Sequence, residues 1–370
     1  MSAHEKPRAP LPAEAMSLPA RYYLDEDHYA RELERLFLAR WFYIGRADEV
    51  PNRGDYVLRE AADESLIVTR GDDGRVRAFF NVCRHRGTRL CEQPSGTFTG
   101  AIRCPYHAWA YDLSGRLLGA PSMDQSPHFR AEDYPLVEAR ADVWDGHLFL
   151  NFAAAPPPLG DQLGALVAKF RPWKMEELRL AHRIVYDVAA NWKLVIQNYS
   201  ECLHCPGVHP ALQRLSHFLS GENSAPTDAY LGGSMDLRDG VETLSRDGRL
   251  VGACVPGLAG DDLRRVHYYA VLPNLLLSLH PDYMMTHRLR PQGVGRTEIV
   301  CEWHFRPEAA DAPEFDPQGA VEFWDLTNRQ DWHVCEQMQL GLASRAYRPG
   351  PYSPREDLLF AFDRLVRGAE

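Results

Sequence analysis

Short runs that alternate apolar and polar residues dominate the chain between residues 41 and 112. Such alternation predicts β-strands with one buried face, and the dipeptide Asp73-Gly74 between two runs is typical of a hairpin turn. Residues 25–40 instead carry apolar side chains at helical spacing. The expected strands are 56–58, 66–69, 76–80 and 147–152. The pattern therefore predicts a helix followed by a small antiparallel β domain.

An Ala- and Pro-rich segment at 153–158 ends that domain, and the chain beyond it mixes both periodicities. Grouped strands between helices predict an α+β domain whose antiparallel sheet is flanked by helices. Strands are expected at 183–188, 266–279, 283–289 and 297–305, and helices near 192–203 and 321–342. We expect three parts: an N-terminal arm and helix (1–40) that packs on the larger domain, the small β domain (41–155) and the larger domain (156–370).

Length and composition agree with two domains and narrow the possible partners. A chain of 370 residues is longer than one hydrophobic core usually supports. The net charge of −10 argues against a nucleic-acid partner, because phosphate binding requires basic patches. No apolar run approaches the ~20 residues that span a bilayer, and residues 1–20 lack a signal-peptide pattern. We expect a cytoplasmic protein with reduced thiols and without a membrane partner.

Two Cys–His pairs provide the first candidate chemistry. Cys83 and His85 are separated by one residue, and Cys104 and His107 by two. Two Cys and two His from paired loops form the ligand set of a Rieske [2Fe–2S] centre. Structural zinc is disfavoured, because zinc fingers usually pair Cys with Cys and His with His, and a Cys83–Cys104 disulfide leaves both His unexplained. The other cysteines are expected to be small buried hydrophobes: Cys91, Cys202, Cys205, Cys254, Cys301 and Cys335.

A second cluster follows from segment 191–204, whose apolar residues share one face of a predicted helix. Glu201 and His204 fall on the opposite face, which alone is typical of a solvated surface. A Pro-Gly pair then breaks the helix, so that His209 can fold back toward His204. Two His around a broken helix end are candidate ligands for one metal.

A triad of two His and one carboxylate, which binds non-heme Fe(II), needs an Asp or Glu from elsewhere. The predicted helix 320–342 offers Asp331, which lies within about 60° of an apolar stripe on the helical wheel. A buried carboxylate is costly unless it is paired or binds a metal. Asp331 is therefore either the third ligand or half of an ion pair with Arg or Lys. Asp325 projects about 120° away and is expected to be solvated.

With these motifs the chain resembles the catalytic α subunit of a Rieske non-heme iron oxygenase, from about Tyr22 to the C-terminus. The Cys–His loops match the family's cluster motif, and segment 191–209 matches its mononuclear-iron motif. Residues 331–341 resemble the segment that carries the third ligand. The Glu-Cys-x-His-Cys run at 201–205 and the C-terminal tail look most like the branch that demethylates quaternary ammonium compounds such as glycine betaine.

The resemblance implies a small antiparallel β Rieske domain and a larger α+β, helix-grip-like catalytic domain. It implies that Glu201 takes the position of the carboxylate that bridges cluster and iron, where many members have Asp. In the family these sites meet between neighbouring subunits of a head-to-tail trimer, so a homotrimer is implied. The implied ligands are Cys83, His85, Cys104 and His107 for the cluster, and His204, His209 and Asp331 for Fe(II).

The implied activity is that of a terminal monooxygenase, which uses O₂ and electrons from a separate NAD(P)H-dependent flavin/iron–sulfur reductase. The chain itself has no Gly-x-Gly-x-x-Gly dinucleotide motif. A quaternary ammonium substrate favours aromatic faces through cation–π attraction. Candidate substrate contacts, each more often plain core packing, are Phe218, Tyr268, Tyr269, Tyr283 and Trp303.

Two other functions stay open at this point. A ring-hydroxylating oxygenase that acts on an aromatic compound or aromatic acid would use an aromatic-rich pocket equally well. A protein of another class, an electron-transfer Rieske protein without a catalytic iron, would need only the two Cys–His loops.

Overall fold

The computed structural model describes residues 8–368 and divides into two compact units. One unit is Phe37–Gln162, and the other combines residues 8–36 with 163–368. The sequence pattern placed the boundaries after residues 40 and 155. Residues 1–7 of the expected N-terminal arm lie outside the described residues.

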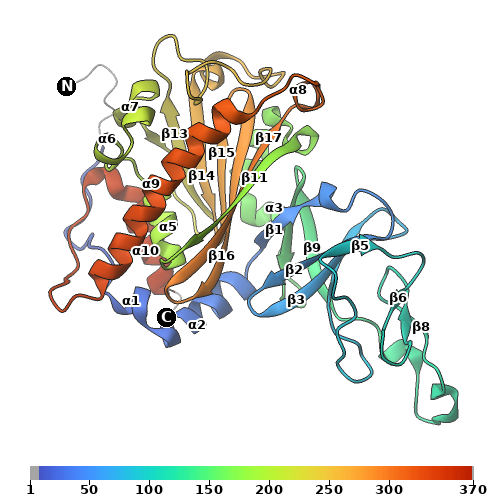
Figure 1. The fold of residues 1–370 in the computed structure, drawn as a ribbon. Helices are drawn as coiled ribbons and strands as arrows, with labels where there is room; N and C mark the ends of the chain where they lie inside the picture. Colours follow the sequence, from blue (N-terminus) through green and yellow to red (C-terminus); the bar gives the residue numbers. More distant parts are fainter. Residues whose placement is uncertain (1–7, 369–370) are drawn as a thin grey trace. The chain divides into compact units, whose positions relative to one another are not determined.

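The smaller unit is built from two antiparallel sheets (Figure 1). One has seven strands in the order β1-β10-β9-β4-β3-β2-β5, and the other is β6-β7-β8. Their bounds are β1 Phe42–Arg46, β2 Asp55–Ala61, β3 Glu64–Arg70, β4 Val76–Phe80, β5 Ser95–Thr97, β6 Ile102–Arg103, β7 Ala110–Tyr111, β8 Leu117–Gly119, β9 Glu138–Trp144 and β10 His147–Asn151. The expected small antiparallel β domain is confirmed.

Strand β3 separates two hydrophobic cores in this unit. Ile67 belongs to one core, which also contains Cys83 and Cys104, whereas Leu66 and Val68 belong to the other. Successive side chains of a strand point to opposite faces, so both faces of β3 are covered. The cluster loops are therefore fixed to a packed core.

The larger unit has one seven-stranded antiparallel sheet in the order β11-β17-β16-β15-β14-β13-β12. Helices α5 and α9 lie across one of its faces (Figure 1). The strands are β11 Arg179–Val188, β12 Glu222–Asn223, β13 Tyr230–Asp236, β14 Arg265–Val271, β15 Leu275–Leu279, β16 Tyr283–Gly293 and β17 Arg296–Phe305. The α-helices are α1 Arg21–Leu24, α2 Glu26–Glu32, α3 Leu159–Leu163 (which spans the boundary), α4 Ala165–Phe170, α5 Trp192–Tyr199, α6 Cys205–Val208, α7 Pro210–Leu215, α8 Pro307–Ala310, α9 Gln318–Leu342 and α10 Asp357–Gly368. The expected α+β class is confirmed.

Three predicted elements differ from the structure. The helix expected at 25–40 continues after α2 as a π-helical segment, Leu33–Leu38. The strand expected at 266–279 is split into β14 and β15 around Pro273, which has no N–H to donate to a ladder. The helix expected at 192–203 ends at Tyr199, where the Ser200 hydroxyl bonds back to the Ile196 carbonyl oxygen at 2.7 Å.

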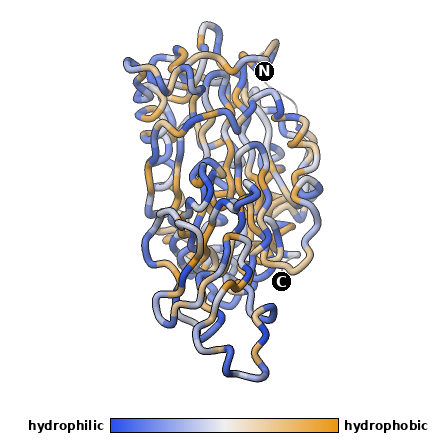
Figure 2. The backbone as a smooth tube through the Cα atoms, turned by 90° about the vertical axis from the view of Figure 1, so that its right-hand side faces the viewer, coloured by the Kyte–Doolittle hydropathy of each residue, from blue (hydrophilic) through white to orange (hydrophobic). Residues whose placement is uncertain are grey.

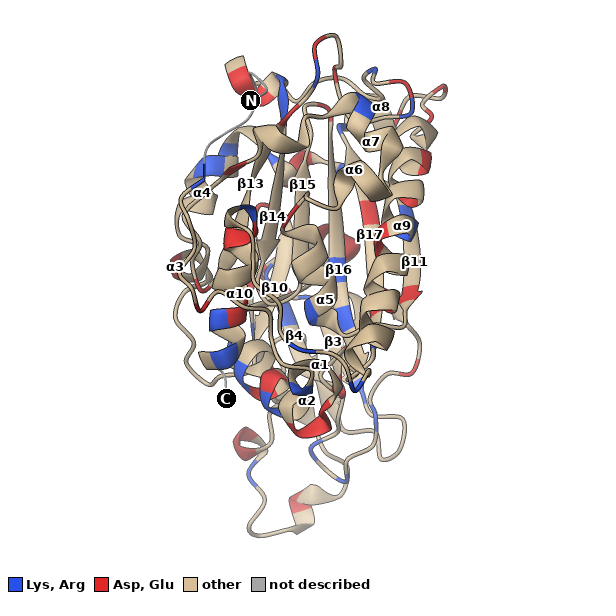
Figure 3. Cartoon of the chain, turned by 90° about the vertical axis from the view of Figure 1, so that its left-hand side faces the viewer, with Lys and Arg blue, Asp and Glu red and all other residues tan. Residues whose placement is uncertain are grey.

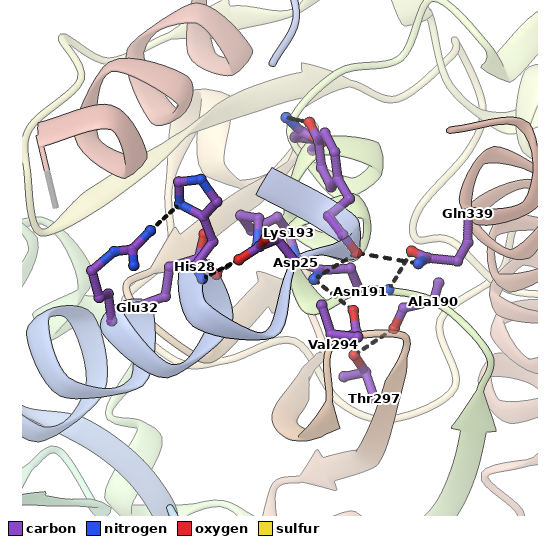
Figure 4. A network of polar contacts seen from close by, with 12 residues as sticks. Asp25, His28, Glu32, Ala190, Asn191, Lys193, Val294, Thr297 and Gln339 are labelled. Carbon is purple, nitrogen blue, oxygen red and sulfur yellow. Dashed lines mark hydrogen bonds and ion pairs between the residues drawn. The ribbon is translucent and has the colours of Figure 1, made fainter. Parts of the chain in front are cut away.

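A buried polar network holds the start of α5 in place (Figure 4). The Lys193 ammonium lies 2.6 Å from a carboxylate oxygen of Glu32 on α2, and both side chains are buried. Asn191 donates from its side chain to the Val294 carbonyl oxygen at 2.7 Å, and its backbone N–H donates to Gln339 of α9 at 3.0 Å. The network connects α2, the β16–β17 turn and α9 around the first turn of α5.

The described N-terminal residues pack on the larger unit. Leu18 is fully buried, and the Ser17 N–H donates to the Gly350 carbonyl oxygen at 2.9 Å. Short hydrophobic and hydrophilic stretches alternate along the chain (Figure 2), and basic and acidic residues are intermixed (Figure 3). Within residues 8–368, none of the helices has both the length and the apolar character to cross a membrane.

Candidate metal centres and active site

The two Cys–His loops have the same local form. Cys83 and Cys104 each begin a tight turn, closed by the Gly87 N–H donating to the Cys83 carbonyl oxygen at 3.0 Å and by the Ala108 N–H donating to that of Cys104 at 3.2 Å. Gly87 has φ +75°, a left-handed conformation that glycine adopts without steric cost. The His of each pair therefore lies within the turn that its Cys begins.

These four side chains fit a Rieske cluster. Both Cys side chains are buried free thiols, so the Cys83–Cys104 disulfide is excluded. The centroids of the His85 and His107 rings lie 4.7 Å apart, and His85 Nδ1 is buried with no hydrogen-bond partner among residues 8–368. An orphaned imidazole nitrogen beside two thiols is what a bound metal would satisfy.

The second cluster forms where α5 ends. Glu201 and His204 lie in the turn between α5 and α6, not on a helix as expected, and His209 follows α6. Asp331 comes from α9, and its Oδ1 lies 2.9 Å from His209 Nε2 and 3.3 Å from His204 Nε2. The structure thus brings together the predicted two His and one carboxylate.

Two neighbouring side chains orient the imidazoles. Glu201 Oε1 lies 2.5 Å from His204 Nδ1, and Gln330 Oε1 lies 2.8 Å from His209 Nδ1. With an N–H at each Nδ1, the Nε2 atoms face Asp331, and their lone pairs would be available to a metal once the proton shared with Asp331 is lost. Such outer contacts set the tautomer of metal-binding His. Gln330 was not predicted, although it directly precedes Asp331 in the sequence.

The electrostatics of this cluster suit a cation. Burial lowers the pKa of His204, but hydrogen bonds to Asp331 and Glu201 outweigh it and raise that pKa to about 10. Burial would raise the pKa of Asp331, yet hydrogen bonds from His204 and His209 keep it below its ordinary value. The carboxylates therefore retain a proton on His204 when no metal is bound, and a divalent metal would replace that proton.

Asp331 and Asp325 have different partners. Among the described residues, the ion-pair partners of Asp331 are His204 and His209 rather than Arg or Lys. Asp325 accepts a hydrogen bond from the Tyr186 hydroxyl at 2.8 Å and pairs with Arg329 at 2.9 Å. The expectation that Asp325 is simply solvated is wrong, because β11 supplies Tyr186 at that side of α9.

The cysteines beside His204 are not free, contrary to the sequence-based expectation. Cys202 and Cys205 form a disulfide, with their Cα atoms 5.0 Å apart. The turn after α5 brings the two residues within the separation that a disulfide requires. The bond closes a short loop around His204. Of the remaining cysteines, Cys254 is only partly buried, whereas Cys91, Cys301 and Cys335 are buried as expected.

A cavity of about 120 Å³ adjoins the triad. Phe218 and Tyr268 line it, together with Trp324, which was not predicted. Trp324 lies seven residues before Asp331, two helical turns along the same face, so its position was readable from the sequence. The other predicted aromatic contacts, Tyr269, Tyr283 and Trp303, do not line the cavity and are fully buried in the core.

Two family patterns match the chain, one for each unit. The pattern described as "Rieske [2Fe-2S] domain" matches residues 40–135. The pattern described as "Ring hydroxylating alpha subunit (catalytic domain)" matches residues 175–369, more than half of the chain.

The chain belongs to the Rieske oxygenase family.

Individual relatives belong to the same family of oxygenases. The chain is 33% identical to the glycine betaine monooxygenase oxygenase subunit of Chromohalobacter salexigens, over 91% of this chain and 82% of the relative. It is 38% identical to the carnitine monooxygenase oxygenase subunit of Escherichia coli strain K12, over 91% of this chain and 87% of that protein. The solved quaternary ammonium Rieske monooxygenase CntA, at 24% identity, shares the fold with a TM-score of 0.83 over 98% of this chain and 99% of CntA.

As a Rieske oxygenase, the protein is an O₂-dependent oxidoreductase with two metal centres. Family membership implies a [2Fe–2S] cluster in the smaller unit and a non-heme iron in the larger unit. The alternative of an electron-transfer Rieske protein is disfavoured, because the catalytic-domain pattern covers the whole segment that carries the triad.

Proposed function

We propose that the protein is the oxygenase component of a monooxygenase that removes an N-methyl group from a quaternary ammonium compound such as glycine betaine. The observation that carries this proposal is the cavity in which the two-His-one-carboxylate cluster adjoins the aromatic side chains of Tyr268 and Trp324. Aromatic faces attract a permanent cation without requiring a hydrogen bond. The names of the relatives that act on glycine betaine and carnitine support the same substrate class.

In this proposal His204, His209 and Asp331 hold Fe(II), and Cys83, His85, Cys104 and His107 hold the cluster. When bound, the iron supplies O₂ activation and the cluster supplies electrons, which arrive from a separate NAD(P)H-dependent reductase. The aromatic walls bind the ammonium group and exclude water, and Glu201 and Gln330 fix the imidazoles. Glu201 also links the iron site to a cluster, which we place on the neighbouring subunit of a homotrimer.

The overall reaction balances with O₂ and one two-electron donor. One oxygen atom enters an N-methyl C–H bond, and the other leaves as water with two protons and two electrons. In the resulting N-hydroxymethyl ammonium compound the hydroxyl loses its proton and the C–N bond breaks, which releases formaldehyde and leaves the electron pair on the nitrogen of a neutral tertiary amine.

The test is turnover of the holoprotein with a compatible reductase, NADH or NADPH, and O₂, scored by formaldehyde release. We expect formaldehyde and O₂ uptake in equal amounts with at least one quaternary ammonium compound. Hydroxylated aromatic acid without formaldehyde would instead support the ring-hydroxylating alternative. About three irons per chain are expected, two in the cluster and one in the triad. Two irons with none regained on addition of Fe(II) would support the electron-transfer alternative.

A further inference from the structure

Two arginines line the cavity beside the triad. Arg8 comes from the N-terminal segment and Arg355 from the segment before α10. Among the described residues that line the cavity, these are the basic side chains, and the acidic ones are Glu201 and Asp331. Both carboxylates are already engaged by His204 and His209. The cavity therefore presents cationic groups that the iron site does not use.

Arg8 is held in place but retains capacity for an anion. Its Nη2 donates to the Gly221 carbonyl oxygen at 2.7 Å, which fixes the guanidinium beside β12. Its Nη1 lies 3.9 Å from Asp357 Oδ2, too far for a hydrogen bond, and the other oxygen of Asp357 accepts from Asn223 at 2.8 Å. Its Nε is buried and makes no hydrogen bond within the described part of the chain.

A guanidinium with open donors suits a carboxylate, which it binds through charge-assisted, frequently bidentate hydrogen bonds. Asp357 balances the charge of Arg8 only at 3.9 Å, so a carboxylate in the cavity would add the charge-assisted hydrogen bonds that Asp357 does not make. The same cavity holds the aromatic side chains of Tyr268 and Trp324, which suit a quaternary ammonium group. These features fit one molecule that carries both a cation and a carboxylate.

We propose that Arg8, assisted by Arg355, binds the carboxylate of the substrate, and that the substrate is therefore a betaine, a zwitterion, rather than a cation such as choline. This inference rests on the proposed function and narrows its substrate class. A choline-like compound would present a hydroxyl to Arg8 and would lack the carboxylate that accepts charge-assisted hydrogen bonds. Discrimination arises because a site built for a polar group rejects a ligand that lacks it.

The test compares ligands that differ only in the carboxylate. Calorimetric titration of the oxidised holoprotein under nitrogen measures Kd for glycine betaine, carnitine, the primary amide of each, and choline. We expect the wild-type protein to bind at least one zwitterion roughly 10- to 100-fold more tightly than its amide. Arg8→Gln should abolish this preference by weakening the zwitterion alone, and Arg8→Lys should keep part of it.

Arg179→Gln serves as the matched control, because Arg179 is exposed on β11 and does not line the cavity. Equal weakening of zwitterion and amide in Arg8→Gln would indicate a merely structural role and overturn the inference. Tighter binding of choline or of the amides by the wild type would overturn it while sustaining the proposed function. Absence of binding for all five ligands would contradict both. If Arg8→Gln does not fold, Arg355→Gln provides the same comparison with a smaller expected loss.

Discussion

At the scale of single residues, Glu201 offers a direct test of the iron site, because it contacts His204 from the turn that follows α5. Its Oε1 accepts from His204, and its other oxygen accepts from the Leu203 N–H. Glu201→Gln preserves size but removes the charge that favours an N–H at His204 Nδ1. We expect it to retain both metals and to lose about 10- to 100-fold in turnover, the usual cost of altering an outer contact of a metal ligand.

The measurements are iron content, the absorption spectrum of the cluster and the steady-state turnover rate. Glu201→Asp provides the matched control, because it keeps the charge with a shorter side chain and should retain more activity than the amide. Unchanged turnover in Glu201→Gln with full metal content would show that electrons reach the iron by another route.

Asp331 and Asp325 form a natural pair for testing the third ligand. Both are on α9, but only Asp331 contacts His204 and His209. Asp331→Ala should lose the mononuclear iron while the cluster spectrum stays intact. Asp325→Ala breaks the contacts with Tyr186 and Arg329 and should retain that iron. Iron quantitation after reconstitution with Fe(II) decides, and iron loss in Asp325→Ala alone would refute the assignment of Asp331.

The structure brings together the site residues that the sequence predicted where chemistry restricts the choice. Cys and His are uncommon enough that their spacing pointed to candidate metal sites, whereas Asp331 was found from its place on the apolar face of a predicted helix. Aromatic residues carry no such restriction, because burial in a core and exposure to a cavity use the same residue types. Tyr268 and Tyr269 are neighbours on β14, yet only Tyr268 lines the cavity, since successive side chains point to opposite faces. Choosing between them required the register of the sheet.

At the scale of elements, a buried ion pair joins α2 to α5. Lys193→Met removes the partner of Glu32 and leaves a buried carboxylate uncompensated, which usually costs about 3–5 kcal/mol. The double variant Glu32→Gln, Lys193→Met should recover most of that loss, because it leaves no buried charge. Urea denaturation of the three proteins measures both changes in the free energy of unfolding. Equal stability of the single variant and the wild type would contradict the prediction.

Helix α10 contains a titrating group that couples stability to pH. Burial raises the pKa of Asp363 from 3.8 to about 6, despite hydrogen bonds from Tyr352 and Gln197. The folded protein thus holds this proton more tightly than the unfolded chain does. The stabilisation that protonated Asp363 gives to the folded state is therefore lost as pH rises from about 4 to about 6. The total loss is about 3 kcal/mol, and above this range the effect of Asp363 on stability no longer changes with pH.

Asp363→Asn should remove this part of the pH dependence. The melting temperature of the variant minus that of the wild type should rise between pH 4 and pH 6 and stay constant from pH 6.5 to pH 8. Scanning calorimetry in buffers of matched ionic strength measures the difference. A difference that does not change with pH would show that Asp363 is ionised throughout this range.

Element boundaries were the weakest part of the sequence-based prediction. The periodicity of α5 continues to residue 203, but Ser200 bonds back to Ile196 and the chain turns there. The same turn brings Cys202 to Cys205, so the disulfide escaped prediction for the same reason as the helix end.

Strand β13 was not predicted either, because Gly232 and Gly233 interrupt its pattern. The structure gives the reason for the first of these glycines. A Cβ atom at position 232 would lie 2.3 Å from the Tyr268 carbonyl oxygen. Close strand packing therefore excludes a side chain there, and the residue that breaks the sequence pattern is the one that the sheet requires.

At the scale of the whole molecule, each unit holds one candidate metal centre, and the proposed reaction requires electrons to pass from one centre to the other. The four proposed ligands of the cluster belong to Phe37–Gln162, and the proposed triad belongs to the other unit. If the protein is a head-to-tail trimer, every junction pairs the cluster of one subunit with the iron of the next. A heterologous interface that closes into a ring has this property.

Mixed trimers provide the decisive measurement. His107→Ala disables the cluster and Asp331→Ala disables the iron site, so each variant alone should be inactive. In a ring that contains both variants, a junction is productive only where an intact cluster faces an intact iron site. A mixed ring contains two copies of one variant and one copy of the other, and in both cases one of its three junctions is productive. Trimers that contain both variants, selected through two different affinity tags, should therefore recover about a third of wild-type turnover. The same two variants purified separately and mixed without subunit exchange form the control. If electrons passed only within one chain, no subunit would carry both working centres, and the mixed trimers would be as inactive as the separate variants.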